Sequence, residues 1–89
     1  MISIVQAKYL DGYRVQIEFS DGARGVFDAA GLVNRAGSMV QPLREPGFFR
    51  DFFIELGALC WRNGFELGPG SLYRKLEEAG LLEKPRAVA

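Results

Sequence analysis

The chain has 89 residues, of which 48% are hydrophobic, and its eleven Lys and Arg balance eleven Asp and Glu. A chain of this length forms one modest core, so we expect a single domain. The balanced charge argues against direct nucleic-acid binding, because affinity for phosphate requires a basic surface. The absence of histidine removes the commonest general base and metal ligand. Most hydrolase and zinc-site hypotheses are therefore excluded, and neither a cofactor nor a metal is expected.

The first third of the chain predicts three antiparallel strands. In the segment YRVQIEFS (13–20), apolar residues alternate with polar ones, which is the pattern of a strand with one buried face. Asp-Gly dipeptides at 11–12 and 21–22 bracket this strand and favour tight turns. The flanking segments 3–10 and 23–28 are expected to pair with it as a three-stranded meander.

The middle of the chain predicts short elements. Asp28 is expected to cap a helical turn over 29–33, and the run 34–41 is expected to be a loop. Pro46 suits the first turn of a helix over 45–52.

The last third predicts a hairpin and a helix. Residues 53–56 and 58–61 are expected to pair, with Gly57 at the first central position of a type II′ turn. Pro69 and Gly80 are expected to start and end a helix. We therefore predict an α+β fold with a curved, mainly antiparallel sheet, formed by the N-terminal meander plus the second hairpin, and two or three short helices. The domain is expected to span 1–80, and the polar tail 81–89 to fray.

Cys60 is the single cysteine, so no intrachain disulfide is expected. Its apolar neighbours Leu59 and Trp61 predict a buried, reduced thiol. The start of the chain, MISIVQAKYL, has neither a charged leader nor a long apolar run. We therefore expect a cytoplasmic protein that does not associate with a membrane.

The segment LCWRNGFELGPGSLYRKL (59–76) concentrates the candidate interaction residues, which are Trp61, Asn63, Gly64, Glu66 and Tyr73. The rings of Trp61 and Tyr73 are suited to stacking on a partner, although core packing is the simpler interpretation of Trp61. Asn63-Gly64 is also typical of a turn. No motif of a catalytic site accompanies these residues, so no catalytic residue and no enzymatic activity are expected.

Several short motifs follow one another in a characteristic order. They are F-x-D-G at 19–22, an Asp at 28, L-x-x-P-x-x-F at 43–49, W-x-N-G-x-[DE]-L at 61–67 and L-Y at 72–73. In this order they resemble the bacterial domain-of-unknown-function family numbered 2442, over residues 3–74. The family usually carries Pro and Asp at the positions of Arg62 and Glu66.

The resemblance implies a small α+β domain with a curved sheet. It also implies a gene beside that of a second small protein, in a toxin and antitoxin-like arrangement. Some family members carry an added helix-turn-helix domain, whereas this chain is expected to be a single-domain member without it.

Three functional hypotheses follow. The first is a non-enzymatic protein-interaction module, antitoxin-like, that binds a small protein encoded by the adjacent gene or forms a homodimer through open strand edges. The second is a transcriptional or autoregulatory accessory protein. The third is a small-ligand-binding or enzymatic domain that uses Asp28 and Glu66, because two carboxylates can support acid and base chemistry.

Overall fold

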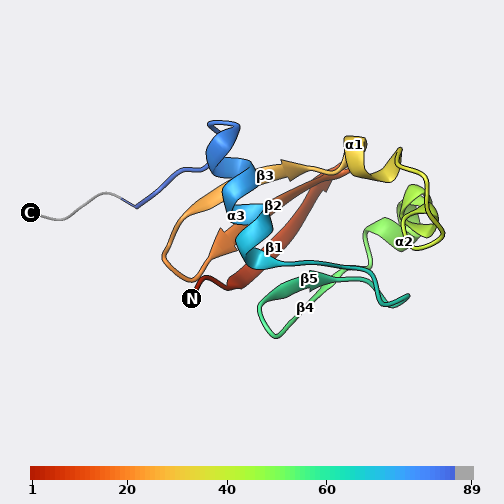
Figure 1. Cartoon of the computed structure of the whole chain (residues 1–89), viewed down its shortest axis with the longest axis horizontal. Helices are drawn as coiled ribbons and strands as arrows, with labels where there is room; N and C mark the ends of the chain where they lie inside the picture. The colour runs from red at the N-terminus through yellow and green to blue at the C-terminus, as the bar shows by residue number, and fades with distance from the viewer. Residues whose placement is uncertain (86–89) are drawn as a thin grey trace, which may run out of the picture.

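The computed structural model describes residues 1–85, which form two small antiparallel sheets and several short helices (Figure 1). Sheet A contains β1 (Ile4–Asp11), β2 (Arg14–Phe19) and β3 (Arg24–Asp28), in that order. Sheet B contains β4 (Phe53–Glu55), β5 (Ala58–Cys60) and β6 (Glu66–Leu67), also in chain order. The predicted α+β class, with a meander and a second hairpin, is confirmed. The meander and the hairpin were predicted to share one curved sheet, but they form two sheets, and β6 adds to the hairpin a third strand that was not predicted.

The helices are short except for the last one. They are α1 (Ala30–Val33), the 3-10 helix η1 (Gln41–Arg44), α2 (Pro46–Phe49) and α3 (Pro69–Glu78). The loop predicted over 34–41 ends at η1, which has a proline in its first turn and buries Leu43. The helix predicted over 45–52 is confined to α2, where the Glu45 side chain accepts a hydrogen bond from the N–H of Gly47 and acts as the cap.

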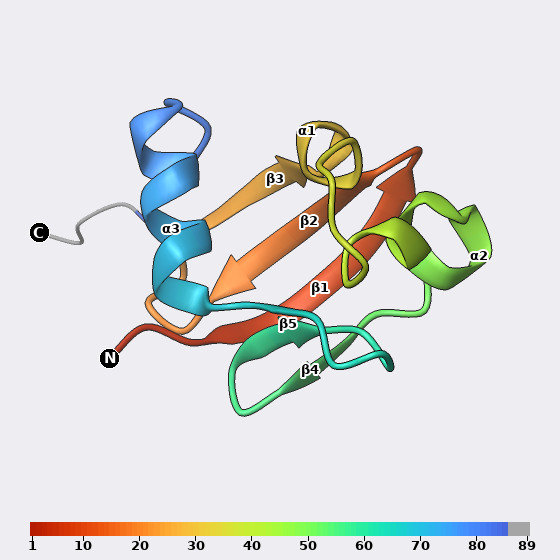
Figure 2. The ribbon, with the colours of Figure 1, turned by 45° about the vertical axis from the view of Figure 1, so that its right-hand side comes forward.

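Sheet A buries one face, as the alternation in β2 predicts. Val15, Ile17 and Phe19 are fully buried, in one core cluster with residues of η1, sheet B and α3. Figure 2 shows α3 crossing the sheet near the end of β2 and the start of β3, where Leu72 and Leu76 complete the core. The opposite face of sheet A carries polar side chains.

The β4–β5 hairpin turns differently from the prediction. Glu55 pairs with Ala58, so the two central residues of the turn are Leu56 and Gly57. Both have positive φ, 51° and 78° respectively, which is the geometry of a type I′ turn and not of type II′. The predicted type was wrong because Gly57 occupies the second central position, and this register follows from strand pairing.

The chain after α3 folds back onto sheet A. Gly80 ends the helix as predicted: its N–H bonds to the carbonyl of Glu77, and the N–H of Leu81 bonds to that of Leu76, which is a Schellman ending. Glu83 then exchanges two backbone hydrogen bonds with Arg24, of 2.9 and 2.7 Å. The tail predicted to fray from 81 is therefore paired with β3 at Glu83, because strand edges accept further backbone. The predicted fraying of 86–89 lies outside the described residues.

Candidate functional site

Trp61 lies in the core. Its side chain is 1% exposed, and the indole Nε1 donates a 2.9 Å hydrogen bond to the carbonyl of Phe49. The ring centroids of Phe49 and Phe65 each lie 5.8 Å from that of the indole. The core interpretation is confirmed, so the indole anchors the end of β5 to α2 and presents no stacking surface to a partner.

Asn63 and Gly64 form the turn that follows Trp61. The Asn63 amide donates to the carbonyl of Met39 at 2.9 Å, and its oxygen accepts from the N–H of Phe65 at 3.2 Å. Because Met39 lies 24 positions earlier, Asn63 ties the turn to the loop before η1. These two residues therefore support the backbone in this structure.

Tyr73 joins α3 to the turn between β2 and β3. Its hydroxyl donates a 2.7 Å hydrogen bond to the Asp21 carboxylate, and its ring packs edge-on against Phe19 at 5.0 Å. This hydrogen bond is the main cause of the lowered pKa of Asp21, which also accepts from the N–H of Ala23. The same bond raises the pKa of Tyr73. The F-x-D-G and L-Y motifs thus meet in space.

Among the five candidate residues, Glu66 has an exposed polar side chain. It lines a hollow of sheet B. This hollow, of about 280 Å³, lies between β4, β5 and the turn before β6. Cys60 is buried in its floor, with Sγ 3.6 Å from the carbonyl of Ala58 and 3.9 Å from the Glu66 carboxylate. Burial, followed by the charge of Glu66, raises the pKa of the Cys60 thiol. The raised pKa favours the protonated thiol, and the burial of Cys60 agrees with the prediction.

Asp28 and Glu66 lie in different sheets. The Asp28 carboxylate accepts a 2.9 Å hydrogen bond from the N–H of Ala30 at the start of α1, as predicted, although Ala29 and not Asp28 occupies the N-cap position. Glu66 is the first residue of β6. Over residues 1–85, no group of three or more acidic or cysteine side chains is placed to hold a metal ion.

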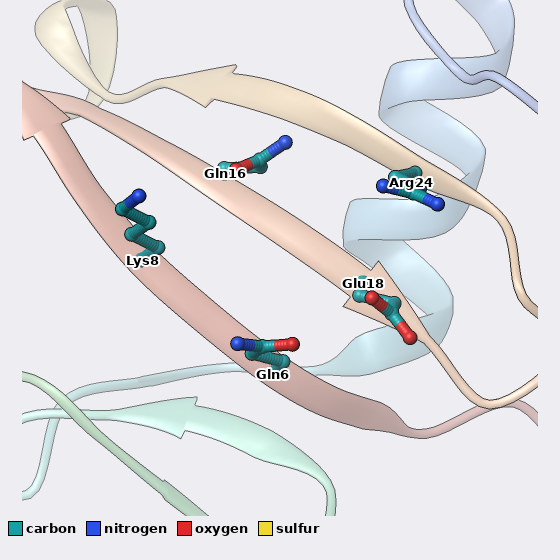
Figure 3. Close-up of a pocket in the computed structure, with 5 residues that line it drawn as sticks. All are labelled: Gln6, Lys8, Gln16, Glu18 and Arg24. Atoms are coloured by element: carbon teal, nitrogen blue, oxygen red, sulfur yellow. The ribbon is translucent and has the colours of Figure 1, made fainter.

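The open face of sheet A forms a second, polar hollow of about 250 Å³ (Figure 3). Five side chains line it: Gln6, Lys8, Gln16, Glu18 and Arg24. Glu18 lies opposite both Gln6 and Arg24 in the strand register, and Lys8 lies opposite Gln16. The charges are mixed, which is typical of a solvated sheet face. The alternation in β2 predicts that Gln16 and Glu18 lie on the exposed face. That Gln6, Lys8 and Arg24 lie beside them follows only from the strand register.

The β4–β5 hairpin carries the most exposed apolar side chain away from the termini, which sequence reasoning did not single out. Leu56 at the turn is 99% exposed, and Phe53 and Ile54 on β4 are 43% and 37% exposed. The signal in the sequence was a leucine directly before the glycine of a hairpin turn, where asparagine or aspartate is usual.

Fold and surface together define a small two-sheet α+β domain. It has an exposed apolar hairpin, and the residues Asp21, Trp61, Asn63 and Tyr73 of its sequence motifs stabilise the fold. The chain belongs to the DUF2442 family, described as a protein of unknown function, whose pattern matches residues 4–78. No curated protein matches the chain, and no solved structure does so either. Within residues 1–85, the helices lack the length and apolar character that crossing a membrane requires.

Proposed function

We propose that this domain is a non-enzymatic interaction module that binds a small protein partner through the β4–β5 hairpin. The observation that carries the proposal is Leu56, a leucine with positive φ whose side chain is almost fully exposed. The left-handed conformation costs a non-glycine residue about 1 kcal/mol or more. Because the side chain is exposed, it makes no packing contacts in the free protein that could offset this cost. Burial of the leucine in a complex explains it best.

The tip of the hairpin is held firmly in place. The carbonyl of Gly57 accepts a 2.9 Å hydrogen bond from the N–H of Ile4. A Cβ on Gly57 would lie 2.8 Å from the Cβ of Ser3, so glycine permits the close approach of the turn to the N-terminal segment. A binding element that is already ordered loses little conformational entropy on association.

β4 adds an edge strand with exposed side chains beside this tip. Among the described residues β4 is hydrogen-bonded to β5 alone, at the edge of sheet B. An extended segment of a partner can pair with such an edge through its backbone, while Phe53 and Ile54 supply apolar contacts. We infer a partner with an exposed strand and an apolar pocket for Leu56.

We also propose that this module acts in the manner of an antitoxin. This role rests on the resemblance to the family, which implies that a second small protein is encoded beside this one. A second copy of this chain is the competing occupant of the same edge.

Co-expression with the product of the adjacent gene, followed by size-exclusion chromatography, tests the proposal. We expect one joint peak, and we expect Leu56→Asn to weaken the complex at least about tenfold, as loss of a buried apolar anchor does. Leu81→Gln is the matched control, because Leu81 is 56% exposed but follows α3, next to β3 and away from the hairpin. Two separate peaks with wild-type protein, or equal effects of both substitutions, would refute the proposal. A dimer of this chain that Leu56→Asn dissociates would assign the hairpin to self-association instead.

A further inference from the structure

A small apolar hollow of about 80 Å³ lies between α1, β3, β6 and α3. Its walls are the side chains of Phe27, Leu32, Leu67 and Leu72. Three polar residues complete the lining: Arg35, Ser71 and Lys75. None of these seven residues belongs to the β4–β5 hairpin, so the hollow is separate from the surface proposed to bind a protein partner.

The two charged side chains that line this hollow, Arg35 and Lys75, are both cations. No acidic side chain lines it. Within residues 1–85, the side chains of Arg35 and Lys75 take part in none of the ion pairs. The guanidinium of Arg44 lies close by, because it donates to the carbonyls of Val33 and Arg35 at 2.7 and 2.9 Å. Since the formal net charge of the chain is zero, this is a local excess of cations beside an apolar cavity.

We propose that the hollow binds a small organic carboxylate with a short apolar tail, such as butyrate. The volume of about 80 Å³ exceeds the roughly 10–15 Å³ that a cavity needs to hold one water, so the hollow has room for a short apolar tail. The tail would replace water against Phe27 and Leu72, and burial of apolar surface favours this exchange.

The carboxylate would lie at the rim, between Arg35 and Lys75. Arginine can donate two parallel hydrogen bonds to a carboxylate, and a charge-assisted bond is stronger than a neutral one. The Ser71 hydroxyl is a further donor on the same rim. Apolar walls with a few converging polar groups are the usual composition of a small-molecule site. A neutral molecule of the same shape would fill the cavity but would leave the cations without a partner.

Titration of the ¹⁵N-labelled protein with sodium butyrate, at constant ionic strength, tests the proposal by NMR. We expect saturable shifts of the amides of Phe27, Leu67 and Leu72, with a dissociation constant in the millimolar range. Butyramide should bind at least about tenfold more weakly, because it cannot form charge-assisted hydrogen bonds. Lys75→Met, which keeps most of the stem and removes the charge, should weaken butyrate binding about tenfold.

Two further variants make the result specific. Ser71 is exposed on the helix surface, so Ser71→Leu should fill the hollow and abolish binding while the protein stays folded. Lys8→Met removes a cation from the opposite face of sheet A and should leave the affinity unchanged. Equal affinity for butyrate and butyramide, shifts that do not saturate, or an equal loss in Lys8→Met would each overturn the proposal.

Discussion

The hydroxyl of Tyr73 donates a 2.7 Å hydrogen bond to the carboxylate of Asp21, which lies 52 positions earlier in the chain. This bond joins the second turn of α3 to the turn between β2 and β3, and the contact of Phe19 with the Tyr73 ring reinforces it. Two motifs that identify the family thus form one structural connection. A role in folding accounts for both motifs in this chain, and the binding surface is to be sought elsewhere.

Tyr73→Phe should lower stability in a pH-dependent way. The pKa of Asp21 is lowered from its ordinary value of 3.8 in the folded protein, mainly by Tyr73. The stabilisation is therefore present above the unfolded pKa and is lost as pH falls through the folded pKa. We expect the variant to have a lower urea midpoint at neutral pH, and the difference from wild type to shrink in acid. Tyr9→Phe is the control, since its hydroxyl donates to the carbonyl of Gly12. A Tyr73→Phe difference that is constant with pH would contradict this account.

The alkaline limb gives an independent check on the same pair. The pKa of Tyr73 is raised from 10.0, mainly by the hydrogen bond to Asp21. Its stabilisation is complete below the unfolded pKa and is lost as pH rises through the folded value. Spectrophotometric titration of the three tyrosines should show one that ionises at a higher pH than the other two. This step should be missing from the titration of Tyr73→Phe.

Trp61→Phe should cost about 2–4 kcal/mol of unfolding free energy. The substitution removes buried volume and leaves the carbonyl of Phe49 without its 2.9 Å donor. Because Trp61 is the single tryptophan, unfolding has to be followed by circular dichroism. Phe52→Leu, at a half-buried ring on the edge of Trp61, should cost less than about 1.5 kcal/mol. Equal costs would mean that the indole hydrogen bond contributes nothing.

Gly25→Ala should detach the segment after α3 from sheet A. A Cβ at Gly25 would lie 2.7 Å from the carbonyl oxygen of Leu81, so the backbone has to move, at a cost of about 1–3 kcal/mol. Hydrogen exchange of the Glu83 amide, which bonds to Arg24, should become faster. Gly70→Ala is the opposite case. No neighbour lies near its added Cβ, so we expect a gain of roughly 0.5–1 kcal/mol. Unchanged exchange at Glu83 in Gly25→Ala would count against the close contact.

Leu56→Asn should stabilise the free domain while weakening partner binding. Asparagine tolerates positive φ better than leucine and is preferred at the first central position of a type I′ turn. We expect the free energy of unfolding to rise by about 0.5–1 kcal/mol, measured by urea denaturation. A loss of stability would show that Leu56 contributes to the fold, and the argument for a binding role would then fail.

Cys60 should react slowly with iodoacetamide in the folded protein. Burial and the Glu66 carboxylate both raise the pKa of its thiol, and only the thiolate reacts. Glu66→Gln removes the second cause, so alkylation at fixed pH should become faster while remaining well below the rate in urea. Mass spectrometry at several times measures both rates. A slower reaction in the variant would invert the proposed effect of the charge.

The candidate site could be predicted only in part. The turn chemistry of Asn63-Gly64 and the apolar surroundings of Trp61 indicate structural roles from the sequence alone. The exposure of Leu56 could not be derived, because it depends on which residues of β4 and β5 face each other. A shift of one residue would have placed Gly57 at the first central position, as we predicted.

By itself, the sequence determined the α+β class, the strand of residues 13–20, the ends of α3 and the hydrogen bond of Asp28 at the start of α1, since alternation, glycine, proline and short polar side chains act over a few residues. Only the tertiary structure decided the hairpin register, the pairing of Glu83 with Arg24, and the meeting of Asp21 with Tyr73. These contacts join segments that are far apart in the chain, or depend on strand register, and the local pattern of residues does not specify which backbone groups will meet.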